Sequence, residues 1–208
     1  MSIDSQQTQP LTGGPMSTEE YLRLDKRILN AKYEYLDGVA RLMSGGSGEH
    51  DQISRNTANA LERHFQSGPC FVHGSDMQVL ISTKSTEREH YVYPDVTISC
   101  DVADRRRGNT LIRSPRIVVE VLSPSTEAID RGKKLAAYKA CPTIQEIVLI
   151  SQFAPHVEIY RRSETDQTTW SYEIFGPGSA VVLKSVDVRL ALDELYKSIN
   201  FDEPLVEE

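Results

Sequence analysis

Two acidic residues lie in stretches that are otherwise typical of buried strands. Glu120 interrupts the apolar run "IVVEVL", and Asp95 follows Pro94 directly before "VTIS". Burying an unpaired carboxylate is unfavourable, so each acid predicts a cation, a hydrogen-bond donor or water beside it. If the two strands are neighbours, the acids can meet, and a divalent cation would neutralise their like charges. A magnesium ion held by two carboxylates can position water and stabilise the charge that develops on a phosphate.

Phosphate chemistry also needs a positive group or a proton donor near the attacked phosphorus. Lys134 is a candidate, because the helix that carries it is predicted to start three to five residues after Glu120. Asp130, Lys134 and Tyr138 are spaced by four residues and would lie along one stripe of that helix. The alternative is an ordinary surface ion pair between Asp130 and Lys134. The spacing alone is compatible with both interpretations.

The elements around these residues alternate between strands and helices. The segment Ile117–Leu122 is apolar at every position except Glu120, which predicts a strand buried on both faces. Pro124 and Ser125 end it and start a helix that runs to about Ala140, and Pro142 separates that helix from a further strand in "IQEIVLI". Such a strand, helix, strand unit predicts parallel neighbours in one sheet.

The N-terminal half predicts further helices and strands. Ser17 and Glu20 have capping-box spacing for a helix to about Asn30, and "YEYLDGVARLM" predicts a hairpin that turns at Asp37-Gly38. Helical spacing of apolar residues in "EHDQISRNTANALERHF" predicts a second helix. Three strands are predicted around Cys70–His73, Met77–Ile81 and Val92–Cys100, with "STKSTEREH" as a turn between the last two.

The C-terminal third predicts strands in "HVEIYRR", "WSYEIF" and "AVVLKS", followed by a short helix near Leu190–Tyr196. Together the elements predict an α/β or α+β fold with a mixed central sheet, flanking helices and additional antiparallel strands. We expect a flexible tail over 1–16, a single domain over 17–197 and an acidic tail over 198–208.

Composition limits the classes of function. The net charge of −7 and a pI of about 5.3 argue against a protein that coats nucleic acid by charge alone. A nuclease can still be acidic, because its catalytic carboxylates contribute to that balance. The first sixteen residues lack the pattern of a signal peptide, and no apolar run approaches the roughly 20 residues of a membrane span, so we expect a cytoplasmic protein that does not enter the membrane. We interpret Cys70, Cys100 and Cys141 as reduced core thiols.

Four motifs in order resemble those of the Uma family of endonuclease-like bacterial proteins. They are Glu34 in "YEYLDG", the "PDV" at 94–96, "VVEVLSPST" around Glu120, and "DRGKKLAAY" over 130–138. The resemblance covers about Ser17 to Tyr196. It implies the restriction-endonuclease-like fold of the PD-(D/E)xK superfamily.

The resemblance also implies an active site. Asp95 and Glu120 would bind Mg²⁺, with Mn²⁺ as a substitute, Glu34 would be an additional acidic ligand, and a lysine would assist the attacking water. The superfamily usually places that lysine two residues after the glutamate, where this chain has Leu122. The counterpart resembles Lys134 in the helix.

Neighbouring residues allow more than one role. Lys133 would point about 100° away from Lys134, towards solvent or a phosphate. His50 opens the second helix at a place where the family tends to have a histidine, and it fits a structural role as well as a phosphate contact or proton transfer. The "SGGSG" stretch before it predicts a flexible connection, with a phosphate cradle at the helix N-terminus as the alternative. Arg105–Arg107 and Arg161-Arg162 predict solvated loop charges, or contacts to a nucleic-acid backbone if they flank the cleft of Asp95 and Glu120. The family's strand after the helix often ends in aspartate, whereas this chain has "EIVLIS" with Val148 and Ser151.

The leading hypothesis is a magnesium-dependent endonuclease that hydrolyses phosphodiester bonds, with DNA as the expected partner. The main alternative is a non-catalytic module that binds nucleic acid or protein on the same fold, and a third is a hydrolase of a small phosphorylated molecule. Restriction enzymes of this kind often act as dimers, so we expect a homodimer.

Overall fold

The computed structural model describes residues 14–28, 30–43, 45–82 and 88–202. Most of the predicted N-terminal tail and part of the predicted C-terminal tail lie outside these residues, as does most of the turn predicted in "STKSTEREH". Residues 15 and 16 already contact the first hairpin, through a bridge from Pro15 to Val39 and a 2.7 Å bond from the Met16 amide to the Gly38 carbonyl.

A capped helix and a tight hairpin open the fold, as the sequence predicts. The Ser17 hydroxyl accepts the Glu20 amide while the Glu20 carboxylate accepts the Ser17 amide, which confirms the capping box. Asp37 and Gly38 turn the hairpin with φ of 52° and 79°, in the left-handed region that this turn needs. The elements are helix α1 (Thr18–Arg27) and strands β1 (Tyr33–Leu36) and β2 (Val39–Leu42).

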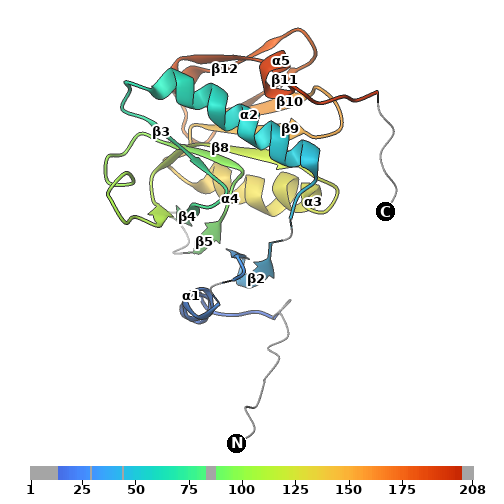
Figure 1. The fold of residues 1–208 in the computed structure, drawn as a ribbon. Helices are drawn as coiled ribbons and strands as arrows, with labels where there is room; N and C mark the ends of the chain where they lie inside the picture. Colours follow the sequence, from blue (N-terminus) through green and yellow to red (C-terminus); the bar gives the residue numbers. More distant parts are fainter. Residues whose placement is uncertain (1–13, 29, 44, 83–87, 203–208) are drawn as a thin grey trace, which may run out of the picture.

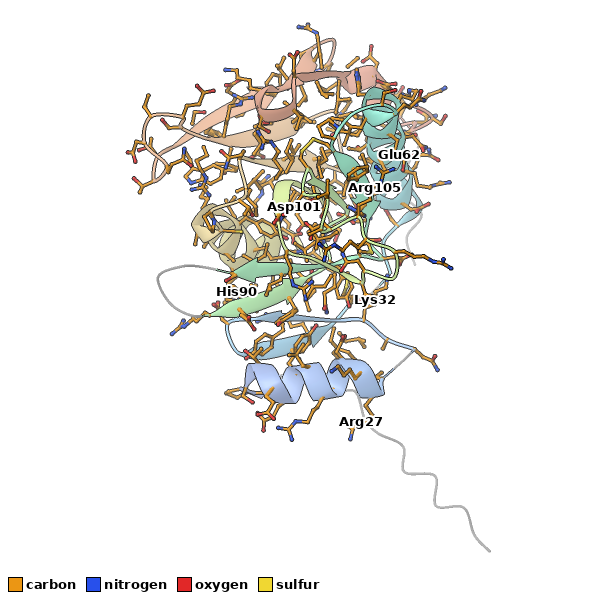
Figure 2. The ribbon with its side chains drawn as sticks, turned by 90° about the vertical axis from the view of Figure 1, so that its left-hand side faces the viewer. Arg27, Lys32, Glu62, His90, Asp101 and Arg105 are labelled. Atoms are coloured by element: carbon orange, nitrogen blue, oxygen red, sulfur yellow. A yellow bond between two sulfur atoms is a disulfide. The ribbon has the colours of Figure 1, made fainter. Side chains whose placement is uncertain are left out.

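The hairpin belongs to a five-stranded sheet in the order β2-β1-β5-β4-β7. Its helix-facing side is built from tyrosines, with the Tyr21 and Tyr35 rings stacked 4.8 Å apart. Figure 2 shows α1, labelled at Arg27, as a layer beneath this sheet, with the larger sheet beyond it. The remaining strands are β4 (Gln78–Ser82), β5 (Glu89–Val92) and β7 (Leu111–Ile112).

The second sheet has six strands in the order β11-β10-β9-β8-β6-β3. Strands β8 and β9 are parallel and joined by a helical crossover, as predicted, whereas the other pairs are antiparallel. The strands are β3 (Phe71–Gly74), β6 (Val96–Ser99), β8 (Pro115–Leu122), β9 (Glu146–Ser151), β10 (Val157–Arg162) and β11 (Trp170–Phe175).

Helices cover both faces of the six-stranded sheet. Ile53 of α2 (Gly48–Phe65) packs in one cluster with Val119, and Tyr138 packs in another with Val118, so β8 is buried on both sides as its sequence predicts. Figure 1 shows α2 on one side of β8 and the crossover helix on the other. The crossover consists of α3 (Glu127–Ile129), a π-helical segment (Asp130–Lys134) and α4 (Leu135–Ala140).

A two-stranded sheet and a short helix end the fold, and this helix is shorter than predicted. The segment expected to be helical over 190–196 begins in a strand, and only its middle forms a helical turn. The elements are β12 (Ala180–Leu183), a 3₁₀ turn (Lys184–Val186), β13 (Val188–Ala191) and α5 (Leu192–Leu195). The architecture is the predicted mixed α/β class. Within the described ranges, none of the helices combines the length and apolar character needed to cross a membrane.

The predicted strand Val92–Cys100 is in fact two strands in two different sheets. β5 ends at Val92 and β6 begins at Val96, so Pro94 lies between them. Proline lacks the N–H that a central strand donates, and the chain uses this interruption to pass from one sheet to the other. Asp95 therefore lies at the junction of the two sheets.

Two of the three cysteines form a disulfide, so the prediction of reduced thiols is wrong for Cys70 and Cys100. β3 and β6 are antiparallel with Phe71 opposite Ser99, so Cys70 and Cys100, the next residue on each side, lie opposite each other. A separation of 30 residues in the sequence gave no sign of this contact. Cys141 is a free buried thiol, as predicted.

The two arginine clusters differ. Arg105–Arg107 are exposed in a loop, as predicted. Arg161 and Arg162 are buried in β10, so the prediction of solvated loop charges is wrong for them. Arg161 Nε donates to Glu146 Oε1 at 2.9 Å and Arg162 Nε donates to the Ile144 carbonyl at 2.7 Å, so both guanidinium groups have hydrogen-bond acceptors inside the protein.

Candidate active site

The predicted site residues converge on one cavity of about 870 Å³ between the two sheets and the two main helices. Tyr138 lies fully buried beneath it and contacts one of the lining acids. The lining includes the six other candidate residues of the predicted active site: Glu34, His50, Asp95, Glu120, Asp130 and Lys134.

Strand pairing brings Asp95 next to Glu120. β6 and β8 are antiparallel neighbours with Val96 opposite Val119, so the residue before β6 lies beside the end of β8. The Val121 amide donates to Asp95 Oδ2 at 2.7 Å and fixes that carboxylate. The condition under which the two acids can meet is therefore fulfilled, because β6 and β8 are neighbours and Asp95 directly precedes β6.

Lys134 lies among three carboxylates. Its Nζ is 2.8 Å from Glu120 Oε1, 3.1 Å from Glu34 Oε1 and 3.2 Å from Asp130 Oδ1. Its side chain is only 5% exposed. Asp130 and Lys134 do pair, but the surface-pair interpretation is wrong because the pair is buried with two further acids.

A π-helical turn carries Lys134. The Leu135 amide donates to the Asp130 carbonyl, five residues earlier, instead of the four of an α-helix. Such turns are rare and occur frequently at functional sites, because they displace the side chains of one helical turn. The α-helical spacing used in the sequence analysis correctly grouped Asp130, Lys134 and Tyr138, but it gave no sign of this turn.

Burial and mutual charge shift the proton affinities of this cluster. Burial raises the pKa of Glu120, and Lys134 opposes that shift. Burial also disfavours the charged form of Lys134, yet attraction to Glu120 and the other acids raises the pKa of Lys134 well above its usual value. Tyr138 donates its hydroxyl to Glu120 Oε1, the oxygen that Lys134 also contacts, and burial raises the pKa of Tyr138. Lys134 is therefore an ammonium at neutral pH.

His50 forms the opposite wall of the cavity. Its Nε2 lies 3.3 Å from Asp95 Oδ2, and this hydrogen bond raises the pKa of His50. The predicted "SGGSG" connection covers 44–48, of which residue 44 lies outside the described residues and Gly48 already begins α2. Its Ser47 caps that helix, because the Ser47 hydroxyl accepts the His50 amide. A Cβ on Gly46 would lie 2.8 Å from His50 Nδ1, so only glycine lets the loop pass this close to the ring.

The acids match the ligand chemistry of Mg²⁺, although they do not form a closed cage. Protein donors use one oxygen of each: Oδ2 of Asp95, Oε1 of Glu120 and Oε1 of Glu34. No described residue hydrogen-bonds their second oxygens. Nor do three or more His, Cys, Asp or Glu side chains among the described residues form a group that could hold a metal. Mg²⁺ commonly uses one or two carboxylates, with waters and substrate phosphate as the other ligands, so the residue types fit.

Several lining residues were not predicted from the sequence. The Tyr93 amide donates to Glu34 Oε1 at 2.9 Å and holds that carboxylate in place. Arg41 and Lys32 line the cavity from the hairpin, and Arg41 is directly opposite Glu34 in the strand register. The predicted turn at Asp37-Gly38 already implied that register, so Arg41 could have been found from the sequence.

Lys133 and β9, the strand that departs from the family's pattern, lie apart from the acids. Lys133 is half exposed, with Nζ 3.6 Å from Asp37 Oδ2 at the hairpin turn, so it faces outward as expected. Val148 packs in the core and the Ser151 hydroxyl accepts the Phe153 amide. Neither Val148 nor Ser151 lines the cavity.

Comparisons with known proteins bear on the family. The sequence model of the Uma2 family, described as "Putative restriction endonuclease", matches residues 18–192. The uncharacterized protein slr1290 of Synechocystis sp. (strain ATCC 27184 / PCC 6803 / Kazusa) is 34% identical over 186 residues, which is 89% of this chain and 94% of that protein. The uncharacterized protein sll1609 of the same strain is 28% identical over 148 residues, 71% of this chain and 81% of its own.

A solved structure shares the fold. The crystal structure of "a putative nuclease belonging to DUF820" from Anabaena variabilis ATCC 29413 matches with a TM-score of 0.67, over 88% of this chain and 98% of that one. The two sequences are 19% identical, so this likeness concerns the fold alone. The family match spans most of the chain and agrees with the motifs and the fold, and the chain is therefore a member of the Uma2 family.

Proposed function

We propose that the protein is a metal-dependent endonuclease that hydrolyses phosphodiester bonds in DNA. The observation that carries this proposal is the convergence of Lys134 with Glu34, Glu120 and Asp130 on the cavity that also contains Asp95. A buried lysine among carboxylates with accessible second oxygens is suited to a reaction in which negative charge develops on a phosphate. Membership of a family described as restriction endonucleases supports the same reaction.

In this proposal Asp95 and Glu120 would hold Mg²⁺, and Glu34 would support it directly or through water. The bound ion would supply an activated water and neutralise charge on the phosphate oxygens. His50 and the Val121 amide keep Asp95 in place, and Tyr138 does the same for Glu120. Ligand carboxylates are commonly oriented by such hydrogen bonds.

Lys134 acts as a hydrogen-bond donor and a positive charge. Since its raised pKa keeps it protonated, it cannot accept the proton of the attacking water at neutral pH. Its Nζ lies within 3.2 Å of one oxygen of each of three carboxylates, so in this proposal Lys134 moves away from one of them when it donates to the water or the phosphate. We propose that it orients the water and stabilises the negative charge of the transition state.

The test is cleavage of supercoiled plasmid, linear single-stranded DNA and RNA, with Mg²⁺ and with EDTA. The proposal predicts Mg²⁺-dependent cleavage of DNA that Glu120→Gln abolishes. Cleavage of RNA alone would correct the substrate. Binding of nucleic acid without cleavage, equal in the wild type and Glu120→Gln, would favour the non-catalytic binding module. The homodimer stays a prediction, which light scattering on the purified protein would test.

A further inference from the structure

One cation in the cavity has no role in the site described above. Arg41 lies on β2 directly opposite Glu34 of β1, and cross-strand partners project from the same face of a hairpin. Both residues line the cavity. The hairpin therefore places a carboxylate and a guanidinium side by side.

Arg41 has no protein acceptor among the described residues. Its Nη1 is shielded from solvent and unpaired, although Glu34 is its immediate neighbour. A buried donor without an acceptor is unfavourable, and native structures rarely leave one without a reason. A turn of the guanidinium into the cavity that Arg41 lines would bring this donor to an anion from outside the chain.

The other positive groups of the cavity are already engaged. Lys134 contacts three carboxylates and His50 contacts Asp95. Lys32 is paired with Asp76 and donates to the Ser75 carbonyl at 3.2 Å. Among the described lining residues, Arg41 is the cation left to meet a polyanion in a cavity otherwise rich in acids.

We propose that Arg41 forms a phosphate subsite, which binds a backbone phosphodiester of the nucleic acid strand next to the one that is cleaved. A guanidinium presents parallel N–H groups that match two phosphate oxygens. A contact of this kind fixes the register of the strand in the cavity and reads no base sequence. The inference rests on the proposed function, since it names a further contact of the same substrate.

The experiment measures binding of a labelled DNA duplex by fluorescence anisotropy over a range of salt, with Ca²⁺ in place of Mg²⁺. Each phosphate contact contributes about 0.9 to the slope of log affinity against log salt for duplex DNA, so Arg41→Gln should lower the slope by about that amount. At low salt its affinity should fall about tenfold. Arg41→Lys should keep the slope but bind more weakly, because it keeps the charge and loses the planar fork.

Arg23→Gln is the matched control. Arg23 is exposed on α1 and paired with Glu19, so this change removes the same charge away from the cavity. Equal affinities and slopes for Arg41→Gln and Arg23→Gln would overturn the subsite while leaving the nuclease proposal intact. A wild type that binds no DNA would overturn both. If thermal unfolding shows that Arg41→Gln does not fold, the DNA affinity of Arg41→Lys is compared with that of the wild type instead. Equal affinities would overturn the subsite.

Discussion

The Lys134 ammonium lies 2.8 Å from a carboxylate oxygen of Glu120, and the side chains of both residues are at most 5% exposed. A buried charge is tolerated only with a partner. Attraction to Glu120 raises the pKa of Lys134, and the Lys134 ammonium in turn opposes the rise that burial causes in the pKa of Glu120. The pair joins strand β8 to the π-helical turn and so connects the sheet to the crossover helix at the cavity.

Removing Lys134 should affect both stability and activity. Lys134→Met leaves buried carboxylates without their cation, so we expect a loss of about 3 to 5 kcal/mol in the free energy of unfolding and at least a ~100-fold loss of cleavage. Urea unfolding and plasmid cleavage measure the two effects.

The neighbouring lysine and a double variant are the controls. Lys133→Met breaks a half-exposed contact to Asp37 and should change stability by less than about 1 kcal/mol. Lys134→Met combined with Glu120→Gln should recover part of the stability but none of the activity. Equal stability of the two single lysine variants would contradict the buried network.

Gly46 should be required for the position of His50. In Gly46→Ala the new Cβ would lie 2.8 Å from His50 Nδ1, so the ring must turn away from Asp95. Loss of a hydrogen bond that orients a metal ligand typically lowers activity about 10- to 100-fold. Cleavage assays should show this loss for Gly46→Ala and for His50→Ala, with no further loss in the double variant. Gly48→Ala, where the added Cβ meets nothing within 4 Å, should behave as the wild type.

The disulfide should contribute measurably to stability. Cys70 and Cys100 close a loop with a sequence separation of 30, for which chain entropy predicts about 3 to 4 kcal/mol. Urea unfolding with and without a reductant measures this difference. Thiol titration of the denatured, unreduced protein should find one thiol, Cys141, and three after reduction. Three thiols before reduction would show that the bond is absent from the purified protein.

The Arg131–Glu158 pair should give a pH-dependent contribution to stability. Arg131 donates from Nη1 and Nη2 to the two Glu158 oxygens at 2.9 and 2.6 Å, and these bonds lower the pKa of Glu158 from 4.5. A lowered pKa in the folded state gives stability that is present above the unfolded value and is lost as the pH falls through the folded value. Glu158→Gln should therefore cost roughly 1 to 2 kcal/mol at pH 7.

The difference between the wild type and Glu158→Gln should shrink as the pH falls below about 4.5. Urea unfolding at several pH values measures it, and Glu62→Gln, at an exposed position on α2, is the control (Figure 2). A difference that stays constant from pH 7 to pH 3 would mean that Arg131 does not hold Glu158 through its charge.

Local signals in the sequence predict an element well where residues close together in the chain determine its start, its turn or its buried faces. The capping box at Ser17, the turn at Asp37-Gly38 and the two-sided burial of β8 depend on residues close in the chain. The crossover from β8 to β9 follows from the order of the elements, which in turn places Lys134 over the end of β8. These features explain why Asp95, Glu120 and Lys134 could be named as candidates from the pattern, whereas Glu34 entered through the resemblance to the family.

Other features depend on contacts that no local pattern records. The disulfide follows from the pairing of β3 with β6, and the burial of Arg161 follows from the distant Glu146. The split of Val92–Cys100 was signalled by Pro94, but which sheet each half joins is a tertiary outcome. In the π turn at Asp130–Lys134 the Leu135 amide donates to the carbonyl five residues earlier instead of four, and no local sequence pattern records this shift of one residue.

The most direct test of the central claim is calorimetric titration of the metal-free protein with Mg²⁺ and Mn²⁺. We predict binding by the wild type and at least a ~10-fold loss of affinity in Asp95→Asn and in Glu120→Gln, because each change removes a charged ligand. Asp193→Asn, at an exposed residue of α5, should bind as the wild type does. Binding that is unchanged in Asp95→Asn and Glu120→Gln, or absent from the wild type both with and without DNA, would contradict the proposed metal site.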